Sequence, residues 1–342
     1  MKKSSYEKIN YSLRPAKAIE RKMLCEAMRR LSFFQNIEGY QYVGFGSTYF
    51  SDFSLIHKTL GIKELISIEK DENNSKRFDF NKPFSCVKIL FGLSAKILPG
   101  INWKKRSIVW VDYDERLNEM MLSDIKTFFF SAKSGSLFII TVDLKPDEPE
   151  FDLDGGDVDI IKYSVKQLTE FRYKKLVERV GSARIPVGTE EINLNLTENP
   201  KIIYQIINDE ILDVISNRNG GLNKYNKLNY RQLFHFIYND GTPMLTVGGI
   251  IYKSHEQALV DKMNFGKLDF IRHGEIPFGI EVPKLTYKEI SALDSLLPRL
   301  VNKTNNKLRR DKKVIIPHLP EEDIKKYSKI YRHFPNFAEA NF

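Results

Sequence analysis

The chain has 342 residues, and 42% of them are hydrophobic, which is enough to bury one large core or two modest ones. Such a composition excludes an intrinsically disordered protein. No run approaches the roughly 18 apolar residues that a transmembrane helix needs, and no apolar segment follows the charged start MKKSSYEKINYSLRP. We therefore expect a cytoplasmic protein that does not enter a membrane.

The chain is basic, with a net charge of +9 and a pI near 9.2. One interpretation is an anionic substrate or a nucleic-acid partner, because basic surfaces attract phosphate groups. The other is an ordinary surface kept soluble by lysines. The basic residues cluster in RPAKAIERK, WKKR and NKLRRDKK, and the sequence leaves open whether these clusters share a face.

Cysteines and carboxylates give no metal site. Cys25 and Cys86 are too few for a disulfide framework or a zinc site, so both are predicted to be core thiols. Residues 147–159 hold seven carboxylates and two glycines, which indicates a solvated loop. Their spacing does not match a calcium-binding loop, and we expect no metal.

The first 145 residues alternate between helical and strand patterns. Residues 15–34 carry apolar side chains at helical spacing, and Pro15 suits the first turn. Strands are predicted within 40–47, 63–71, 86–92, 106–115 and 135–144, with helices at 49–61, stopped by Gly61, and at 117–133. Strands separated by helices are typical of a parallel, doubly wound sheet.

The second half begins with two helical patterns, near 163–180 and 198–217. Residues 231–253 then form the clearest hairpin pattern, two apolar strands joined by a turn at Asn239, Asp240 and Gly241. The tail from 253 is punctuated by prolines and helical, and Thr286 with Glu289 forms a capping-box pattern.

A candidate nucleotide site follows the first strand. Ligands of open parallel sheets bind beyond the carboxyl ends of the strands, where glycines let the backbone approach. Gly44 and Gly46 fit that role, and Glu69 stands at the end of the next strand, where a carboxylate usually accepts hydrogen bonds from a ribose. Proteins that bind nicotinamide, flavin or S-adenosylmethionine all share this pattern, so the pattern alone does not distinguish the three cofactors.

The order of elements resembles that of class I S-adenosylmethionine-dependent methyltransferases, whose seven-stranded sheet ends in an antiparallel hairpin. A closer similarity, over most of the chain, is to a bacterial family labelled "putative O-methyltransferases". It rests on NYSLRPAKAIERKML, YVGFGSTYFSDF, LGIKELISIEKD, FNKPF and WVDYD. Because that label follows from the fold, it carries little information on the substrate.

The resemblance implies an α/β fold with three parts. An N-terminal helical segment, 1–37, precedes a doubly wound, seven-stranded Rossmann-like domain, 38–252, which ends in the antiparallel hairpin. Residues 253–342 are expected to form a small helical or winged-helix-like appendage.

The resemblance also implies S-adenosyl-L-methionine as the cofactor. The glycine turn would hold it by main chain, Glu69 would bind the ribose, residues near Ser94 would lie by the adenine, and Asp112 would face the methionine end or the acceptor. The expected cofactor contacts are Gly44, Phe45, Gly46, Ser47, Glu69, Lys70, Leu93, Ser94 and Asp112. Three residues depart from the pattern that is usual in this fold. Tyr42 and Ser94 stand where acidic residues are usual, and Thr48 stands where the third glycine is usual.

Methyl transfer to oxygen needs an aligned acceptor and a base for its proton. Asp112, Tyr113 and Asp114 follow a buried strand and are the candidates for that work. Alternatively, a carboxylate caps the next helix and Tyr113 only packs. Arg14, Lys17 and Arg21 could contact a phosphate or the substrate, or they could form a solvated helix face.

The sequence therefore predicts a methyltransferase that acts on an unidentified, anionic acceptor. The alternative keeps the fold without the catalysis, as a binding or scaffold subunit of a bacterial defence or nucleic-acid complex. A nicotinamide-dependent oxidoreductase is disfavoured by the hairpin. The oligomeric state and the nature of any protein partner are left open.

Overall fold

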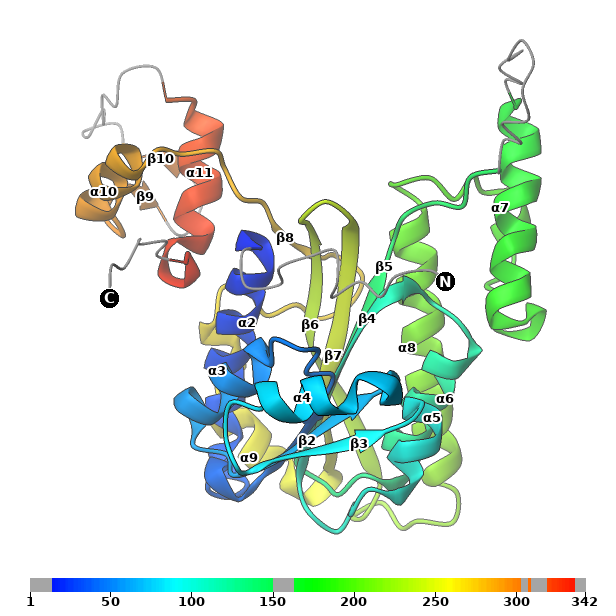
Figure 1. Cartoon of the computed structure of the whole chain (residues 1–342). Coiled ribbons are helices and arrows are strands. Elements are labelled where there is room, and N and C mark those ends of the chain that lie inside the picture. Colours follow the sequence, from blue (N-terminus) through cyan, green and yellow to red (C-terminus); the bar gives the residue numbers. More distant parts are fainter. Residues whose placement is uncertain (1–13, 150–162, 303–306, 309–318, 336–342) are drawn as a thin grey trace.

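The computed structural model describes residues 14–149, 163–302, 307–308 and 319–335, and a mixed sheet forms its centre (Figure 1). Within the described residues this sheet has eight strands, in the order β3-β2-β1-β4-β5-β7-β6-β8. They are β1 (Gln41–Gly44), β2 (Glu64–Glu69), β3 (Val87–Phe91), β4 (Ser107–Arg116), β5 (Ser136–Asp143), β6 (Leu228–Asn239), β7 (Pro243–Lys253) and β8 (Phe278–Ile280).

The strand directions place a topological switch point at the centre of the sheet. Strands β1 to β5 pair in parallel, whereas β7 is antiparallel to both β5 and β6. The chain runs outward from β1 through β2 to β3 and then returns to β4 on the other side of β1. Because the loops after β1 and β4 diverge, the carboxyl edge between them is the switch point where such sheets bind ligands.

Two layers of helices cover the sheet, each over its own apolar core. One layer consists of α2 (Pro15–Met28), α3 (Ser51–Leu60), α4 (Ser75–Asn81) and α9 (Gln257–Lys262). The other consists of α5 (Ser94–Ile97), α6 (Glu119–Ser131) and α8 (Asn199–Arg218), and α7 (Val165–Val180) packs against α6 beside this layer (Figure 1). The doubly wound α/β prediction is therefore confirmed.

Local signals in the sequence account for most of these elements. Helix α3 ends at Gly61, whose φ of 71° lies in the left-handed region that favours glycine. The predicted helix over 15–34 is α2 followed by a 3₁₀ segment, Arg29–Phe33. Cys25 is buried as predicted, while Cys86 is only partly buried against the same core.

The predicted hairpin is formed by β6 and β7, but it does not end the sheet. Strand β8 pairs in parallel with β6, at Phe236 opposite Phe278, so eight strands replace the seven that we expected. After β7 the chain returns to the first core, where Val260 and Phe278 are buried. A strand of three residues is too short to give a periodic signal, which is why the sequence did not reveal it.

A small C-terminal unit stands above one end of α2 (Figure 1). It contains α10 (Tyr287–Leu296), β9 (Val301–Asn302), β10 (Lys307–Leu308) and α11 (Glu321–Ile330). Leu293, Leu300, Ile324 and Tyr327 form its own core, and the capping box of Thr286 and Glu289 is present. The expected domain boundaries and the winged-helix comparison stay predictions.

The acidic segment is only partly within the described residues. Residues 150–159 lie outside them, while Asp147 accepts hydrogen bonds from Arg179 and Glu148 pairs with Arg172.

Among the described residues, no helix combines the length and the apolar character that crossing a bilayer requires. That same part of the chain holds no group of three or more His, Cys, Asp or Glu side chains suited to a metal ion.

Candidate active site

The glycine turn after β1 is tightly packed. A Cβ on Gly46 would lie 2.5 Å from the Phe50 ring, and one on Gly44 would lie 2.7 Å from the Tyr42 hydroxyl and 2.9 Å from the Trp110 carbonyl oxygen. Ser47 has a φ of 50°, a strained conformation for a residue with a side chain. Strain of this kind is kept where the surrounding structure enforces it, which is common at ligand sites.

Glu69 lies against this turn. Its Oε1 accepts hydrogen bonds from the Gly46 amide at 2.9 Å and from the Ser67 hydroxyl at 2.6 Å. Burial raises the pKa of Glu69, and the hydrogen bonds from Ser67 and Gly46 partly oppose that rise. The net result is a pKa of about 7. Glu69 forms no ion pair within the described residues.

Lys17 of α2 brings a positive charge to the carboxyl end of β4. Its Nζ lies 2.7 Å from Asp112 Oδ1, 2.7 Å from Glu20 Oε2, and 4.5 Å from the centre of the Trp110 ring. Burial alone would lower the pKa of Lys17, but Asp112 and Glu20 hold it well above its usual value. The ammonium group therefore stays charged, and it can donate hydrogen bonds but cannot act as a base.

A buried polar network extends from this pair. Lys17 Nζ also donates to the Tyr238 hydroxyl of β6 at 3.1 Å. Glu20 accepts from Thr246, which lies 2.9 Å from the Thr141 hydroxyl. The backbone amide of Lys17 donates to Asp240 in the hairpin turn at 2.8 Å. Helix α2, β4 and the β6–β7 hairpin are thus fixed to one another around one residue.

These contacts correct our interpretation of the basic residues of α2. Lys17 and Arg21 are only 4% and 8% exposed, so they form neither a solvated helix face nor an open phosphate site. Arg21 is bound to Asp52 of α3. Both cations can be buried because carboxylates from β4 and α3 pair with them where α2 packs on the sheet. Arg14 is partly buried just before α2.

Tyr113 and Ser94 lie away from the Lys17–Asp112 pair. Along β4 side chains alternate between faces, so Tyr113 enters the second core while Asp112 faces the first. The Tyr113 hydroxyl donates to Asp124 and lies 3.0 Å from Ser94 Oγ. Burial and Asp124 raise the pKa of Tyr113, so its hydroxyl group stays protonated and is not available as a base. Its contacts match the packing role that we considered as the alternative.

The other predicted site residues are exposed or partly buried. Asp114 is exposed, and Lys70 pairs with Glu115 at 3.0 Å on the surface. Leu93 is 44% exposed at the start of α5, and the Phe45 ring packs edge-on against Tyr113 at 5.0 Å. The structure thus brings together the glycine turn with Glu69 and, separately, Asp112 with Lys17.

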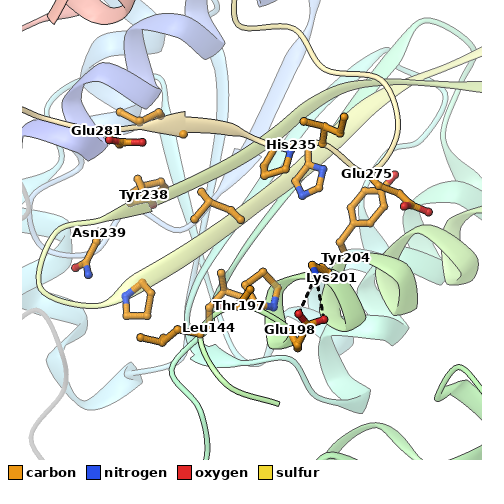
Figure 2. A pocket seen from close by; sticks show the side chains of 18 of the residues that line it. Leu144, Thr197, Glu198, Lys201, Tyr204, His235, Tyr238, Asn239, Glu275 and Glu281 are labelled. Carbon is orange, nitrogen blue, oxygen red and sulfur yellow. Dashed lines mark hydrogen bonds and ion pairs between the residues drawn. The ribbon is translucent and has the colours of Figure 1, made fainter. Parts of the chain in front are cut away.

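A cavity beside β6 has no counterpart among the sequence predictions. It has a volume of about 1190 Å³ and lies at the carboxyl ends of β5 and β6, between α8 and the segment that follows β8 (Figure 2). Tyr238 lines this cavity and also contacts Lys17. The Tyr238 ring belongs to the first core, whereas Ile237 and α8 line the cavity from the second core, so the cavity and the Lys17–Asp112 pair lie on opposite faces of the sheet.

Sequence reasoning missed Glu20, Asp52 and Tyr238 as partners of the basic residues. One signal was available, because Lys17 and Arg21 continue the helical stripe of Leu24, Met28 and Leu31, all of which are buried. A charge on the apolar stripe of a helix calls for a buried partner.

One family model matches the chain over residues 9–342, and its description is "Putative O-methyltransferase". This span includes the glycine turn, Glu69 and Asp112. No curated protein matches the chain in sequence.

Among solved structures the chain is similar to PigF with SAH, at 13% identity over 62% of this chain and 56% of that one, with a TM-score of 0.31. It is also similar to a mutant of MtNAS in complex with S-adenosylmethionine, at 14% identity over 35% and 45%, with a TM-score of 0.27. A third is Trm1 from Pyrococcus horikoshii with S-adenosyl-L-methionine, at 8% identity over 81% and 68%, with a TM-score of 0.41. The aligned part thus spans about half the length of the first two chains.

We predict that Lys17→Met destabilises the protein by about 3–5 kcal/mol at neutral pH, because it leaves the buried Glu20 and the partly buried Asp112 without a cation. Urea unfolding measures this loss. The matched control is Lys58→Met, at an exposed position of α3, which should change stability by less than about 0.5 kcal/mol. Equal effects of the two substitutions would contradict a structural role of the pair.

A second prediction concerns the pH dependence that Glu69 creates. Its pKa is raised from 4.5 to about 7, so its contribution to the free energy of unfolding is complete below about pH 4.5 and is lost as the pH rises to about 7. The loss amounts to about 3 kcal/mol. Glu69→Gln should remove this part of the pH dependence in urea unfolding, and identical profiles for both proteins would refute the assignment.

Proposed function

The chain belongs to this O-methyltransferase family, and we propose that it transfers the methyl group of S-adenosylmethionine to an oxygen atom of an acceptor at the carboxyl edge of the sheet. The observation that carries the proposal is the position of Glu69, hydrogen-bonded to the Gly46 amide at the switch point. A carboxyl group next to a glycine turn is what a nucleoside ligand requires there.

The residues present fit such a cofactor. Glu69 offers carboxyl oxygens to ribose hydroxyls, and the strained turn at Ser47 presents backbone to the same place. Leu93, which is 44% exposed beyond β3, supplies an apolar surface for the adenine ring. When bound, S-adenosylmethionine supplies an electrophilic methyl group on a positively charged sulfur.

Asp112 and Lys17 are the residues that would act on the acceptor. The side chain of Asp112 is 19% exposed, which leaves it accessible at the edge next to β1. We propose that Asp112 orients the hydroxyl group of the acceptor and accepts the proton of that group. Lys17 holds the Asp112 carboxylate in place, and its positive charge stabilises negative charge that develops on the acceptor oxygen.

A second candidate function is a binding or scaffold subunit that keeps the fold without catalysis. It is favoured by one observation, because the Gly46 amide already has acceptors in Glu69 and Ser67. The replacement of the usual acidic residue by Tyr42, which is fully buried, points the same way. Cofactor binding separates the two candidates.

We expect calorimetry to show binding of S-adenosylmethionine and S-adenosylhomocysteine by the purified protein. Glu69→Ala should weaken both by about tenfold or more, because the ribose loses its hydrogen-bond acceptor. Glu72→Ala, at an exposed position nearby, is the matched control and should bind as the unchanged protein does. If the unchanged protein gives no heat with either ligand, the scaffold function is correct and the enzymatic one is wrong.

For the transfer step, Asp112→Asn should lower the rate of methyl transfer about a hundredfold, because removal of a general base typically lowers a reaction rate by about that factor. The affinity for the cofactor should stay within a few fold of that of the unchanged protein. The assay follows tritiated methyl groups from S-adenosylmethionine into a cell extract. Asp114→Asn changes an exposed carboxylate two residues away and should leave the rate unchanged. A normal rate for Asp112→Asn would exclude this residue from the reaction.

A further inference from the structure

A second cleft opens at the amino edge of the sheet, where β4 and β6 begin and β7 ends, and we call it the amino-edge cleft. Its volume is about 630 Å³. Glu69 and Asp112 lie at the opposite edge, because they stand at the far ends of their parallel strands. Within the described residues, the charged or titratable side chains that line the cleft are Arg106, Lys133, Arg218, Lys253, His255 and Glu256.

Arg106 is already neutralised inside the protein. It donates to the Ser134 carbonyl oxygen at 2.9 Å and to Gln35 Oε1 at 3.0 Å. Its second terminal nitrogen lies 3.9 Å from Glu256 Oε1, so these two charges offset each other. The remaining lysine and arginine side chains of the cleft form no ion pair within the described part of the chain, and they are Lys133, Arg218 and Lys253.

Arg218 carries a positive charge that the described residues do not neutralise. It ends α8 in a partly buried position, and its Nη1 donates to the Phe129 carbonyl oxygen at 2.8 Å. Burial lowers the pKa of Arg218, and no carboxylate among the described residues offsets that effect. The guanidinium group still stays charged at neutral pH. Because a partly desolvated cation without an anionic partner is unfavourable, this arginine indicates that an anion completes the site.

The three unpaired cations lie on the same side of the sheet. Asn219 exchanges two hydrogen bonds with the backbone of Leu228, at 2.7 and 2.8 Å, and so holds the end of α8 at the start of β6. Leu228 pairs directly with Lys253 and belongs to the second core. Since directly opposite side chains of antiparallel strands share a face, Lys253 lies on the face that α6 and α8 cover. Lys133 follows the end of α6, and Arg218 ends α8.

The ends of these two helices reduce the positive charge without cancelling it. Each carboxyl-terminal helix end is equivalent to about −0.5 of an elementary charge. One of them already receives a hydrogen bond from Arg218, through the Phe129 carbonyl oxygen. Together the two ends offset about one of the three cations, so a surplus of about two positive charges is left for a ligand.

Apolar and aromatic surface adjoins these cations. Leu222, which is 39% exposed, and the partly buried Trp103 line the amino-edge cleft. Beside them the His255 ring stacks at 4.2 Å on Tyr225, which is 65% exposed. Proteins that bind single-stranded nucleic acid combine cations for the phosphates with aromatic side chains for the bases.

We propose that the amino-edge cleft binds single-stranded nucleic acid, with one phosphate group held by Lys133, Arg218 and Lys253 and a base against the neighbouring apolar and aromatic surface. Lys224 and Lys227 are exposed in the loop between α8 and β6. Positive charge therefore continues beyond the cleft, which suits a strand rather than a free nucleotide. The proposal goes beyond methyl transfer and does not depend on it, because the two sites lie at opposite edges of the sheet.

Fluorescence anisotropy with a short, fluorescein-labelled single-stranded oligoribonucleotide tests the proposal. Lys133→Gln/Lys253→Gln should bind it about tenfold more weakly at low salt. The slope of log affinity against log salt should fall by about 1.4, since each phosphate contact of a single strand contributes about 0.7. The matched control, Lys174→Gln/Lys288→Gln, removes the same charge at exposed positions of α7 and α10 and should bind as the unchanged protein does. Equal affinity of the two double variants, or no binding by the unchanged protein, would overturn the proposal.

Arg218 has a test of its own. Arg218→Gln should weaken binding of the oligoribonucleotide about tenfold, whereas Arg218→Lys keeps the charge and should lose about threefold or less. Urea unfolding of both variants shows whether losing the contact with Phe129 impairs folding. A folded Arg218→Gln variant that binds as tightly as the unchanged protein would overturn the proposal.

Competition experiments identify the chemistry of the ligand. An excess of unlabelled oligoribonucleotide should displace the labelled strand, and AMP at the same concentration should not. Displacement by AMP at that concentration, or equal displacement by poly-glutamate, would overturn the nucleic-acid strand in favour of a free nucleotide or of any polyanion. Calorimetry with S-adenosylmethionine should be unchanged in Lys133→Gln/Lys253→Gln. Absence of cofactor binding by the unchanged protein would overturn methyl transfer alone and leave this site standing.

Discussion

The ion pair between Lys17 and Asp112 is the interaction on which the arrangement of the site depends. A lysine that is 4% exposed is tolerated only with partners, and this one has Asp112, Glu20 and the Tyr238 hydroxyl within 3.1 Å. Those partners come from β4, α2 and β6. One buried charge therefore fixes the N-terminal helix over the carboxyl edge and holds the Asp112 carboxylate at the end of β4.

Along this edge the molecule offers three successive environments. The glycine turn and Glu69 lie at β1 and β2, Asp112 with Lys17 lies at β4, and the apolar cavity begins at β5 and continues to β6. A cofactor over β2 and β1 would direct its reactive end toward β4, where Asp112 and Lys17 lie.

Much of this could be predicted from the sequence, because apolar runs that end in glycine or in carboxylates mark buried strands and their edges. The glycine turn, Glu69 and Asp112 are recognisable in this way. Strand alternation could also have assigned Tyr113 to the face opposite Asp112. The rest depended on contacts far apart in the chain, since Lys17 and Tyr238 are separated by 221 residues, and the cavity forms from segments that meet only in the folded protein.

Net charge says little about any one site for a related reason. A charge of +9 sums every charged residue of the sequence, whereas binding depends on the few groups that line one site. Lys17 and Arg21 are neutralised inside the protein, and the cavity carries more carboxylates than ammonium groups. Composition does not report such local burial and pairing, and the anionic acceptor stays a prediction.

The central claim is that a nucleoside is held at the carboxyl edge by the backbone at 44–47 and by Glu69. A crystal structure of the protein with S-adenosylhomocysteine tests it most directly. Our account places the ribose hydroxyls within hydrogen-bond distance of Glu69 and the sulfur near Asp112. Density for the ligand at any other place, or a Glu69 carboxyl group bonded only to Gly46 and Ser67 in the complex, would contradict it.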